Sequence, residues 1–150
     1  MRSSSDWTAA WTEARALLLV TWTREPAFLA DPSSRRLLEL SLAVAACRDE
    51  LVVHAHVVLP GAFHVIGALP CRGSWPRVLG QVKANHARWN AQRRPNGTAR
   101  APHWRSKVLV QPLSAADLPL AVHALHCLPV REGLVTSPAE WDASSWHLSG

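Results

Sequence analysis

The spacing of hydrophobic and polar residues predicts four strands and three helices along the chain. Runs rich in Val, Leu, Ile and Trp, bounded by turn residues, predict strands at residues 15–23, 51–58, 63–69 and 107–111. Longer segments with helical periodicity predict helices at 33–48, 75–93 and 117–127. A turn at 59–61 joins the second and third strands.

Two of the predicted helices have a recognisable buried face. Ser33 or Ser34 is expected to cap the first, whose broad apolar face comprises Leu37, Leu38, Leu40, Leu42 and Val44. In the second, the positions that share one face are Trp75, Val78, Leu79, Val82, His86 and Trp89. Arg77 and Arg88 fall on the opposite side and Lys83 on the flank. This helix is therefore expected to pack on a sheet and to present cations to solvent.

The order of these elements predicts the fold class. Strand, helix, strand, strand, helix, strand is the split βαβ, ferredoxin-like plan, an α+β fold with an antiparallel sheet. We expect the helices on one face of the sheet, followed by an extra C-terminal helix. Residues 1–150 then form a single domain, with an N-terminal extension at 1–13 and an irregular tail at 129–150. Trp7 and Trp11 are expected in a short helix that covers the sheet.

Composition narrows the class of protein. Hydrophobic residues make up 48% and charged residues 18% of the 150 positions, which is typical of a globular chain. No apolar run approaches the roughly 18 residues that a membrane span needs. The three cysteines, Cys47, Cys71 and Cys127, form no CxxC pair, which favours reduced thiols and a cytoplasmic protein.

The basic residues are concentrated in one stretch. Residues 51–116 contain no Asp or Glu but nine of the sixteen Lys and Arg residues, in a chain of net charge +5. Such a block is typical of a surface that binds a polyanion, because an ordinary solvated face mixes both signs. The predicted nucleic-acid contacts are Arg77, Lys83, Arg88, Arg93, Arg94, Arg100, His103, Trp104, Arg105 and Lys107. Within this set Trp104 has two interpretations, as an exposed stacking platform for an unpaired base or as a core anchor.

Histidines provide the candidate metal chemistry. With the turn at 59–61, His56 would lie opposite His64, and positions 54, 56, 62 and 64 would share one face of the sheet. His54, His56 and His64 are then candidate ligands for a divalent metal, and packed or nucleic-acid-facing histidines are the alternative. No other cofactor motif is present in the sequence. His123 and His126 on the third helix offer a further, histidine-based nucleophile.

Several segments, in the right order, resemble the REP-associated tyrosine transposases. Residues 53–65 read V-H-A-H-V-V-L-P-G-A-F-H-V, similar to the family's V-x-A-Y-V-x-M-P-N-H-V-H-L hairpin. Residues 28–32 (F-L-A-D-P), 128–135 (L-P-V-R-E-G-L-V) and 138–146 (P-A-E-W-D-A-S-S-W) resemble the family's helix opening, N-P-V-R-A-G-L-V segment and C-terminal ending. His103-Trp104-Arg105 lies where the family often has L-W-Q-x-R. The resemblance covers the chain from about Leu17 to its end.

This resemblance implies a DNA-hairpin-binding fold whose chemistry has been lost. In the family, two histidines one residue apart on a strand hold a metal with an asparagine, and a helix tyrosine attacks the phosphodiester. Here Ala62 stands at the first histidine, only His64 remains, Ala124 stands at the tyrosine and Leu128 at the asparagine. The 150 residues contain no tyrosine at all.

Three functions follow as hypotheses. The first is a catalytically inactive protein that binds structured single-stranded nucleic acid, above all DNA hairpins, although RNA is also compatible with the pattern. The second is a metal-dependent nuclease that uses His54, His56 and His64. The third is a domesticated, non-catalytic subunit of a protein or nucleoprotein complex. A cytoplasmic, nucleoid-associated protein of bacterial type is expected, without membrane contact, as a monomer or a homodimer.

Overall fold

The protein folds as a four-stranded antiparallel sheet with two long helices packed on one of its faces. The structure is a computed structural model that describes residues 16–48, 51–68, 75–93 and 104–148. The strands are β1 (Ala16–Thr23), β2 (Val52–Leu59), β3 (Ala62–Ala68) and β4 (Trp104–Leu113), in the order β2-β3-β1-β4. Strand pairs β1–β3, β1–β4 and β2–β3 are all antiparallel, which confirms the ferredoxin-like plan. The expected Trp7 and Trp11 helix lies outside the described residues.

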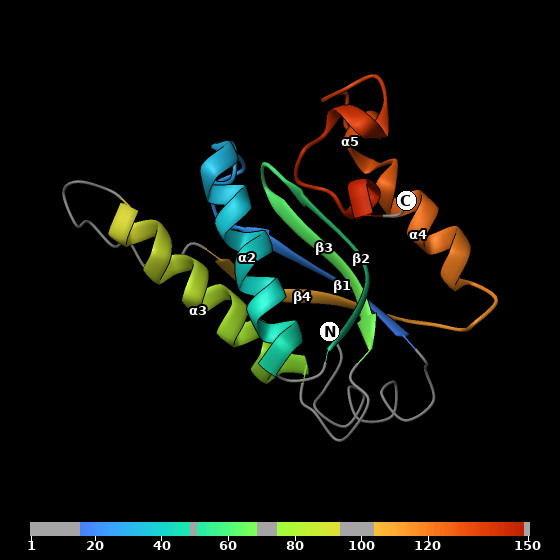
Figure 1. The fold of residues 1–150 in the computed structure, drawn as a ribbon, viewed down its shortest axis with the longest axis horizontal. Helices are drawn as coiled ribbons and strands as arrows, with labels where there is room; N and C mark the ends of the chain where they lie inside the picture. The colour runs from blue at the N-terminus through green and yellow to red at the C-terminus, as the bar shows by residue number, and fades with distance from the viewer. Residues whose placement is uncertain (1–15, 49–50, 69–74, 94–103, 149–150) are drawn as a thin grey trace.

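The helices are α2 (Pro32–Arg48), α3 (Trp75–Arg93), α4 (Leu118–His126) and the short α5 (Leu128–Arg131). In Figure 1, α2 and α3 lie on one side of the sheet, and α4 lies on the other side, next to β2. The bounds of α3 are those predicted from its periodicity. Among the described ranges, no helix has both the length and the apolar character that a membrane crossing requires.

The start of α2 differs from the prediction. Asp31, rather than Ser33 or Ser34, acts as its cap, because the Asp31 Oδ1 accepts a hydrogen bond from the Ser33 backbone N at 3.0 Å. Pro32 occupies the first position, where a missing N–H is tolerated. Ser34 is buried instead, and its hydroxyl is hydrogen-bonded to the His86 ring of α3 at 3.1 Å.

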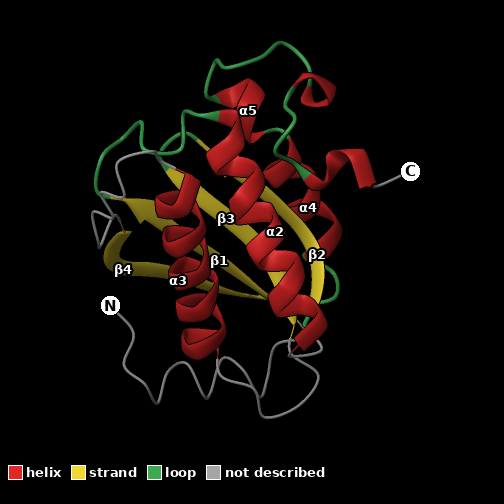
Figure 2. Ribbon diagram, turned by 60° about the vertical axis from the view of Figure 1, so that its left-hand side comes forward, coloured by secondary structure: helices red, strands yellow, loops and turns green. Residues whose placement is uncertain are grey.

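A large part of the core lies between the sheet and the α2–α3 pair, which face each other in Figure 2. Another part, including Val57, Ile66 and Leu125, lies on the other face of the sheet, where α4 contacts β2. The largest fully buried side chains of the core include Leu17 and Leu19 of β1, Phe63 of β3, Leu38 of α2 and Val82 of α3. The broad apolar face predicted for α2 is too wide, since Leu40 is 51% exposed. On α3 the predicted buried positions are buried, apart from the partly exposed Trp89, and Arg77 and Arg88 are exposed as predicted.

The tail is more regular than expected. Beyond α5 it contains two short 3-10 helices, Pro138–Glu140 and Ser145–Leu148. Between them, Ser144 forms an isolated antiparallel bridge with Val57, and the Val58 backbone N donates to the Ala143 carbonyl at 2.9 Å. The tail therefore occupies the outer edge of β2, which would otherwise expose unpaired backbone groups.

Candidate nucleic-acid interface

Side-chain alternation assigns each strand residue to one of the two faces of the sheet. Gly67 approaches α3 so closely that a Cβ there would lie 3.1 Å from the Trp75 ring. Gly67 and its β1 partner Leu17 therefore face the helices. Ala62 and His64, at odd spacing from Gly67 along β3, point to the opposite face. We call this opposite side the open face.

On the open face, β1 and β4 present both an aromatic ring and cations. Trp22 is paired with Ala62 and is partly exposed. On β4, Leu109 is paired with Val20, so Leu109 and, by alternation, Lys107 and Arg105 share this side. Arg105, Lys107 and Gln111 are all exposed. The exposed part of this face lies along β4 and beside Trp22, since Val20, Ala62 and Ile66 on the same face are buried. A partly exposed indole and two exposed cations are suited to contact both the bases and the phosphates of a nucleic acid.

His64 sits within this face as a neutral imidazole. It pairs with Val20 on one side and Val57 on the other. Burial lowers the pKa of His64 from 6.5 to about 4, because the charged ring would lose its hydration. At neutral pH the side chain therefore adds no charge to the open face. Its nitrogens are available for a hydrogen bond or as a metal ligand.

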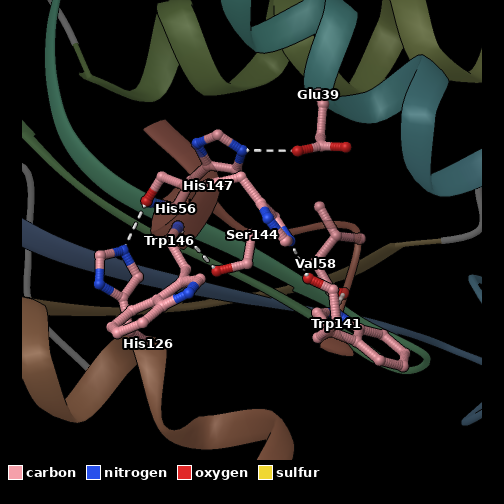
Figure 3. Close-up of polar contacts among 9 residues, drawn as sticks. Glu39, His56, Val58, His126, Trp141, Ser144, Trp146 and His147 are labelled. Atoms are coloured by element: carbon pink, nitrogen blue, oxygen red, sulfur yellow. Dashed lines mark hydrogen bonds and ion pairs between the residues drawn. The ribbon is translucent and has the colours of Figure 1, made fainter. Parts of the chain in front are cut away.

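The expected pairing of His56 with His64 is wrong. His56 pairs with Val65, and His64 pairs with Val57, so the two imidazoles lie on opposite faces. The cause is the turn, which comprises only Pro60 and Gly61, so that Leu59 pairs with Ala62 and the register differs by one residue from the one expected for a turn at 59–61. A separate irregularity between Val53 and Ala55 leaves His54 without a partner residue on β3. His56 instead points toward α2, where its Nε2 is 2.8 Å from the Glu39 Oε2 (Figure 3).

This arrangement does not suit a metal held by the three histidines. In the described part of the chain, no three His, Cys, Asp or Glu side chains are grouped so as to hold a metal ion. At the positions that the transposase resemblance assigns to the metal, Ala62 and Leu128 supply no donor atom, and only His64 does. The residues present therefore do not fit the family's metal. Ala124, at the position that the resemblance assigns to the tyrosine, is an exposed residue of α4.

The predicted basic contacts are divided between two sides of the molecule. Arg105 and Lys107 lie on the open face, whereas Arg77 and Arg88 are exposed on α3, which covers the other face. Arg88 also donates a hydrogen bond to the Asn85 side chain at 2.8 Å. The backbone of Arg93 ends α3, and Arg94, Arg100 and His103 lie outside the described residues.

Trp104 serves as a core anchor. Only 7% of the residue is exposed, and its ring lies edge-on to His86 at 6.0 Å between centroids. Lys83 extends over the same ring, with its Nζ 5.4 Å from the centroid, and burial lowers the pKa of this lysine. The stacking interpretation of Trp104 does not hold in this conformation, because α3 covers the ring. Trp22 of β1 is the more accessible of these two indoles.

A second polar cluster, which sequence reasoning missed, holds the tail to the sheet. The Ser145 Oγ accepts a hydrogen bond from the His56 backbone N at 2.9 Å and is hydrogen-bonded to the His126 Nε2 at 2.8 Å (Figure 3). Trp141 donates from its Nε1 to the Val58 carbonyl at 2.8 Å. Burial and the neighbouring His56 and His123 lower the pKa of His126. The resemblance at residues 138–146 was the available signal for this cluster, but it gave no contacts.

A cleft of about 370 Å³ opens beside the β2–β3 turn, on the side of Trp22 and Ala62. Arg105 of β4 and Glu132 after α5 border it as well. No motif in the sequence groups Glu132 with Trp22, because the two residues lie far apart along the chain. The cleft is therefore a product of the tertiary fold.

Comparison with known proteins identifies the fold. No family model matches the sequence, and no curated protein matches it. A solved structure of a REP-associated tyrosine transposase bound to a REP hairpin is similar, with a TM-score of 0.77 and 16% sequence identity, over 90% of this chain and 78% of that one. A putative transposase from Deinococcus radiodurans is similar with a TM-score of 0.51 and 18% identity, over 73% of this chain and 89% of that one. The protein thus has a transposase-like fold.

Proposed function

We propose that this protein binds structured single-stranded nucleic acid, above all DNA hairpins, and does not cleave it by the chemistry of the tyrosine transposases. The observation that carries the proposal is the open face, where Arg105 and Lys107 are exposed near Trp22. The two cations belong to the stretch 51–116, which contains no acidic residue. Cations bind the phosphates, and an accessible indole stacks on a base that is not paired. The fold is similar to that of a transposase bound to a hairpin.

The proposed loss of catalysis rests on the residues themselves. A tyrosine nucleophile is unavailable because the chain contains none. The open face retains His64, but Ala62 and Leu128 offer no further metal ligand. Without a metal to polarise the phosphate or a nucleophile to attack it, the surface keeps the capacity to bind and loses the capacity to react. The nuclease hypothesis is weakened further because His56 and His64 lie on opposite faces.

The test is a binding titration against four fluorescent strands of matched length: hairpin DNA, unstructured single-stranded DNA, duplex DNA and hairpin RNA. Anisotropy is measured at two salt concentrations. We expect the tightest binding to hairpin DNA and a marked loss of affinity at the higher salt, because each neutralised phosphate releases counterions. Equal, weak or salt-independent binding to all four strands contradicts the proposal and favours the hypothesis of a protein-binding subunit.

Matched pairs of substitutions locate the interface. Arg105→Gln with Lys107→Gln removes two charges from the open face, and Arg77→Gln with Arg88→Gln removes two from the outer side of α3. We expect the first pair to weaken hairpin binding by at least about tenfold and to lower the salt slope by about two. The second pair has the same change in net charge and is expected to leave most of the affinity. If the second pair of substitutions weakens hairpin binding more than the first, the interface lies on α3 instead of the open face.

A further inference from the structure

One side of α4 carries four residues that share a face and turn away from its buried side. Leu125 and His126 are buried, whereas the opposite side of the helix is exposed or half-buried. The outward residues recur at spacings of three and four, so they form one stripe along the helix. They are Leu120, His123, Ala124 and Cys127, and Leu120 is 74% exposed. We call these four residues the outer stripe of α4.

Two residues of the outer stripe are metal ligands that already lie together. The Cys127 Sγ is 3.7 Å from the His123 Nε2. A thiolate sulfur and an imidazole nitrogen bound to one tetrahedral zinc ion are roughly 3.5 Å apart, given their usual bond lengths to the metal. The helix fixes the spacing of the pair, because the Cys127 backbone N donates to the His123 carbonyl at 3.1 Å. The two side chains can therefore bind a zinc ion with little rearrangement, and such ligands favour zinc over magnesium or calcium.

The fold does not require these two side chains for any other contact. Cys127 is a free, half-buried cysteine, and His123 is exposed. Within the described part of the chain, neither the thiol nor the ring forms another hydrogen bond or an ion pair. His126, the next imidazole along α4, is buried and bonded to the Ser145 Oγ at 2.8 Å. The pair of His123 and Cys127 is therefore the part of this cluster that a metal ion reaches from solvent.

One chain supplies only half of a closed zinc site. Among the described residues, no third His, Cys, Asp or Glu side chain is placed to join His123 and Cys127 around an ion. Structural zinc takes four protein ligands, and two cysteines with two histidines are one of the usual sets. Two copies of the chain, related by a twofold axis through the ion, supply this set. The second copy therefore completes the site without a ligand from any other protein.

The other two residues of the outer stripe suit the approach of a second α4. Ala124 is next to His123 and has a small side chain, so a partner helix can come close to the metal. Leu120 lies one helical turn earlier, and contact with the partner would remove apolar surface from water. No Lys, Arg, Asp or Glu belongs to the stripe, so like charges do not meet there. Four residues a side bury far less than the roughly 800 Å² per partner of a stable interface, and association therefore depends on the metal.

We propose that two copies of this chain bind one zinc ion between their α4 helices, through His123 and Cys127 of each copy. Each thiol releases its proton to solvent as the sulfur–zinc bond forms, and each imidazole binds the ion through the lone pair of a neutral nitrogen. The product is a homodimer that exists only with the metal. This inference goes beyond the proposed function, because it uses residues of α4 that the open face does not require.

The test titrates Zn²⁺ into the metal-free, untagged full chain, with a phosphine reductant present, and measures the mass by sedimentation velocity. We expect the mass of one chain to become that of two, with saturation at one zinc ion per two chains and reversal by EDTA. Cys127→Ser and His123→Gln should each abolish the dimer. Cys47→Ser removes another exposed thiol, on α2, and is the matched control that should dimerise like the natural protein. In a parallel titration, Co²⁺ should give the near-ultraviolet absorption of a sulfur–cobalt bond, and Cys127→Ser should lose it.

Three outcomes overturn the proposal. The first is a chain that stays monomeric at saturating zinc, including one that binds one ion per chain without a change in mass. The second is a zinc-dependent dimer that Cys127→Ser leaves intact. The third is a dimer that forms without metal and disappears with the reductant, which would be a disulfide between two copies. Circular dichroism melts verify that each variant is folded. Metal binding elsewhere in the chain is measured in the Cys127→Ser background, which lacks this site.

Discussion

Ser145 and His126 are joined by a hydrogen bond of 2.8 Å that connects the C-terminal tail to the end of α4. The same Ser145 hydroxyl accepts the backbone N–H of His56 at 2.9 Å. One buried side chain thus links the tail, α4 and the edge of β2. This link holds the end of α4 next to β2, the strand that precedes the β2–β3 turn.

Ser145→Ala should therefore destabilise the protein. The substitution leaves the His56 N–H and the buried His126 ring without this partner, and each unsatisfied buried group costs about 1–3 kcal/mol. We expect a loss of about 2–4 kcal/mol in the free energy of unfolding, measured by urea denaturation. Ser106→Ala, at an exposed position of β4, is the control and should change stability by less than about 0.5 kcal/mol. Equal stability of the two variants would show that the link contributes nothing.

The low pKa of His64 predicts a loss of stability in mild acid. Its pKa of about 4 in the folded protein lies below the 6.5 of an exposed histidine, so the unfolded state binds the proton first. The stabilising contribution is complete above pH 6.5 and is lost as the pH falls toward 4. Between pH 7 and 5 we expect a decrease of about 2 kcal/mol in the free energy of unfolding.

Urea denaturation at several pH values measures this dependence, and two variants assign it. His64→Gln should make the free energy of unfolding fall less steeply with decreasing pH. Part of the decrease should persist, because the pKa of the buried His126 is also lowered. His54→Gln changes an exposed ring and should leave the curve as it is. A pH profile that is unaffected by His64→Gln would show that burial of this ring does not govern the acid response.

Two glycines should respond to alanine in opposite directions. A Cβ at Gly61 would lie 2.5 Å from the Pro26 carbonyl oxygen, so Gly61→Ala must displace backbone next to the cleft. We expect a loss of roughly 1–3 kcal/mol in thermal or urea unfolding. A Cβ at Gly80, within α3, meets nothing within 4 Å. Gly80→Ala should stabilise the protein by about 0.5–1 kcal/mol, because alanine favours the helix. A neutral Gly61→Ala would show that the turn adjusts freely.

Ala62→His should create a metal site, because the natural chain has only one histidine, His64, of the required pair. Positions 62 and 64 lie on the same face of β3, and His64 is neutral above about pH 4 and ready to ligate. We expect Co²⁺ to bind the variant, with an absorption band in the visible range, at least tenfold more tightly than the natural protein. Ala62→Asn is the control of similar polarity. No gain in a folded variant would indicate that the two side chains do not converge.

Local patterns determined the secondary structure and the order of its elements. The helix Trp75–Arg93 was predicted to its ends because its apolar residues recur with helical spacing and polar turns flank it. The succession of strands and helices along the chain predicted the ferredoxin-like plan, and that plan has the strand order β2-β3-β1-β4 in the sheet. The sequence also determined that the tyrosine nucleophile is absent, since that conclusion needs only the composition.

The tertiary structure alone decided which side chains meet. The β2–β3 turn comprises two residues, Pro60 and Gly61, instead of the predicted three, which shifts the register by one residue. His56 and His64 therefore lie on opposite faces, because strand side chains alternate with a period of two. Packing of α3 buried Trp104 and left Trp22 accessible, although both occur in strands. The residues of the basic stretch lie on two sides of the molecule, because α3 covers one face of the sheet and the exposed cations of β4 lie on the other face. Register and layer packing depend on contacts between distant segments, and no local pattern encodes those contacts.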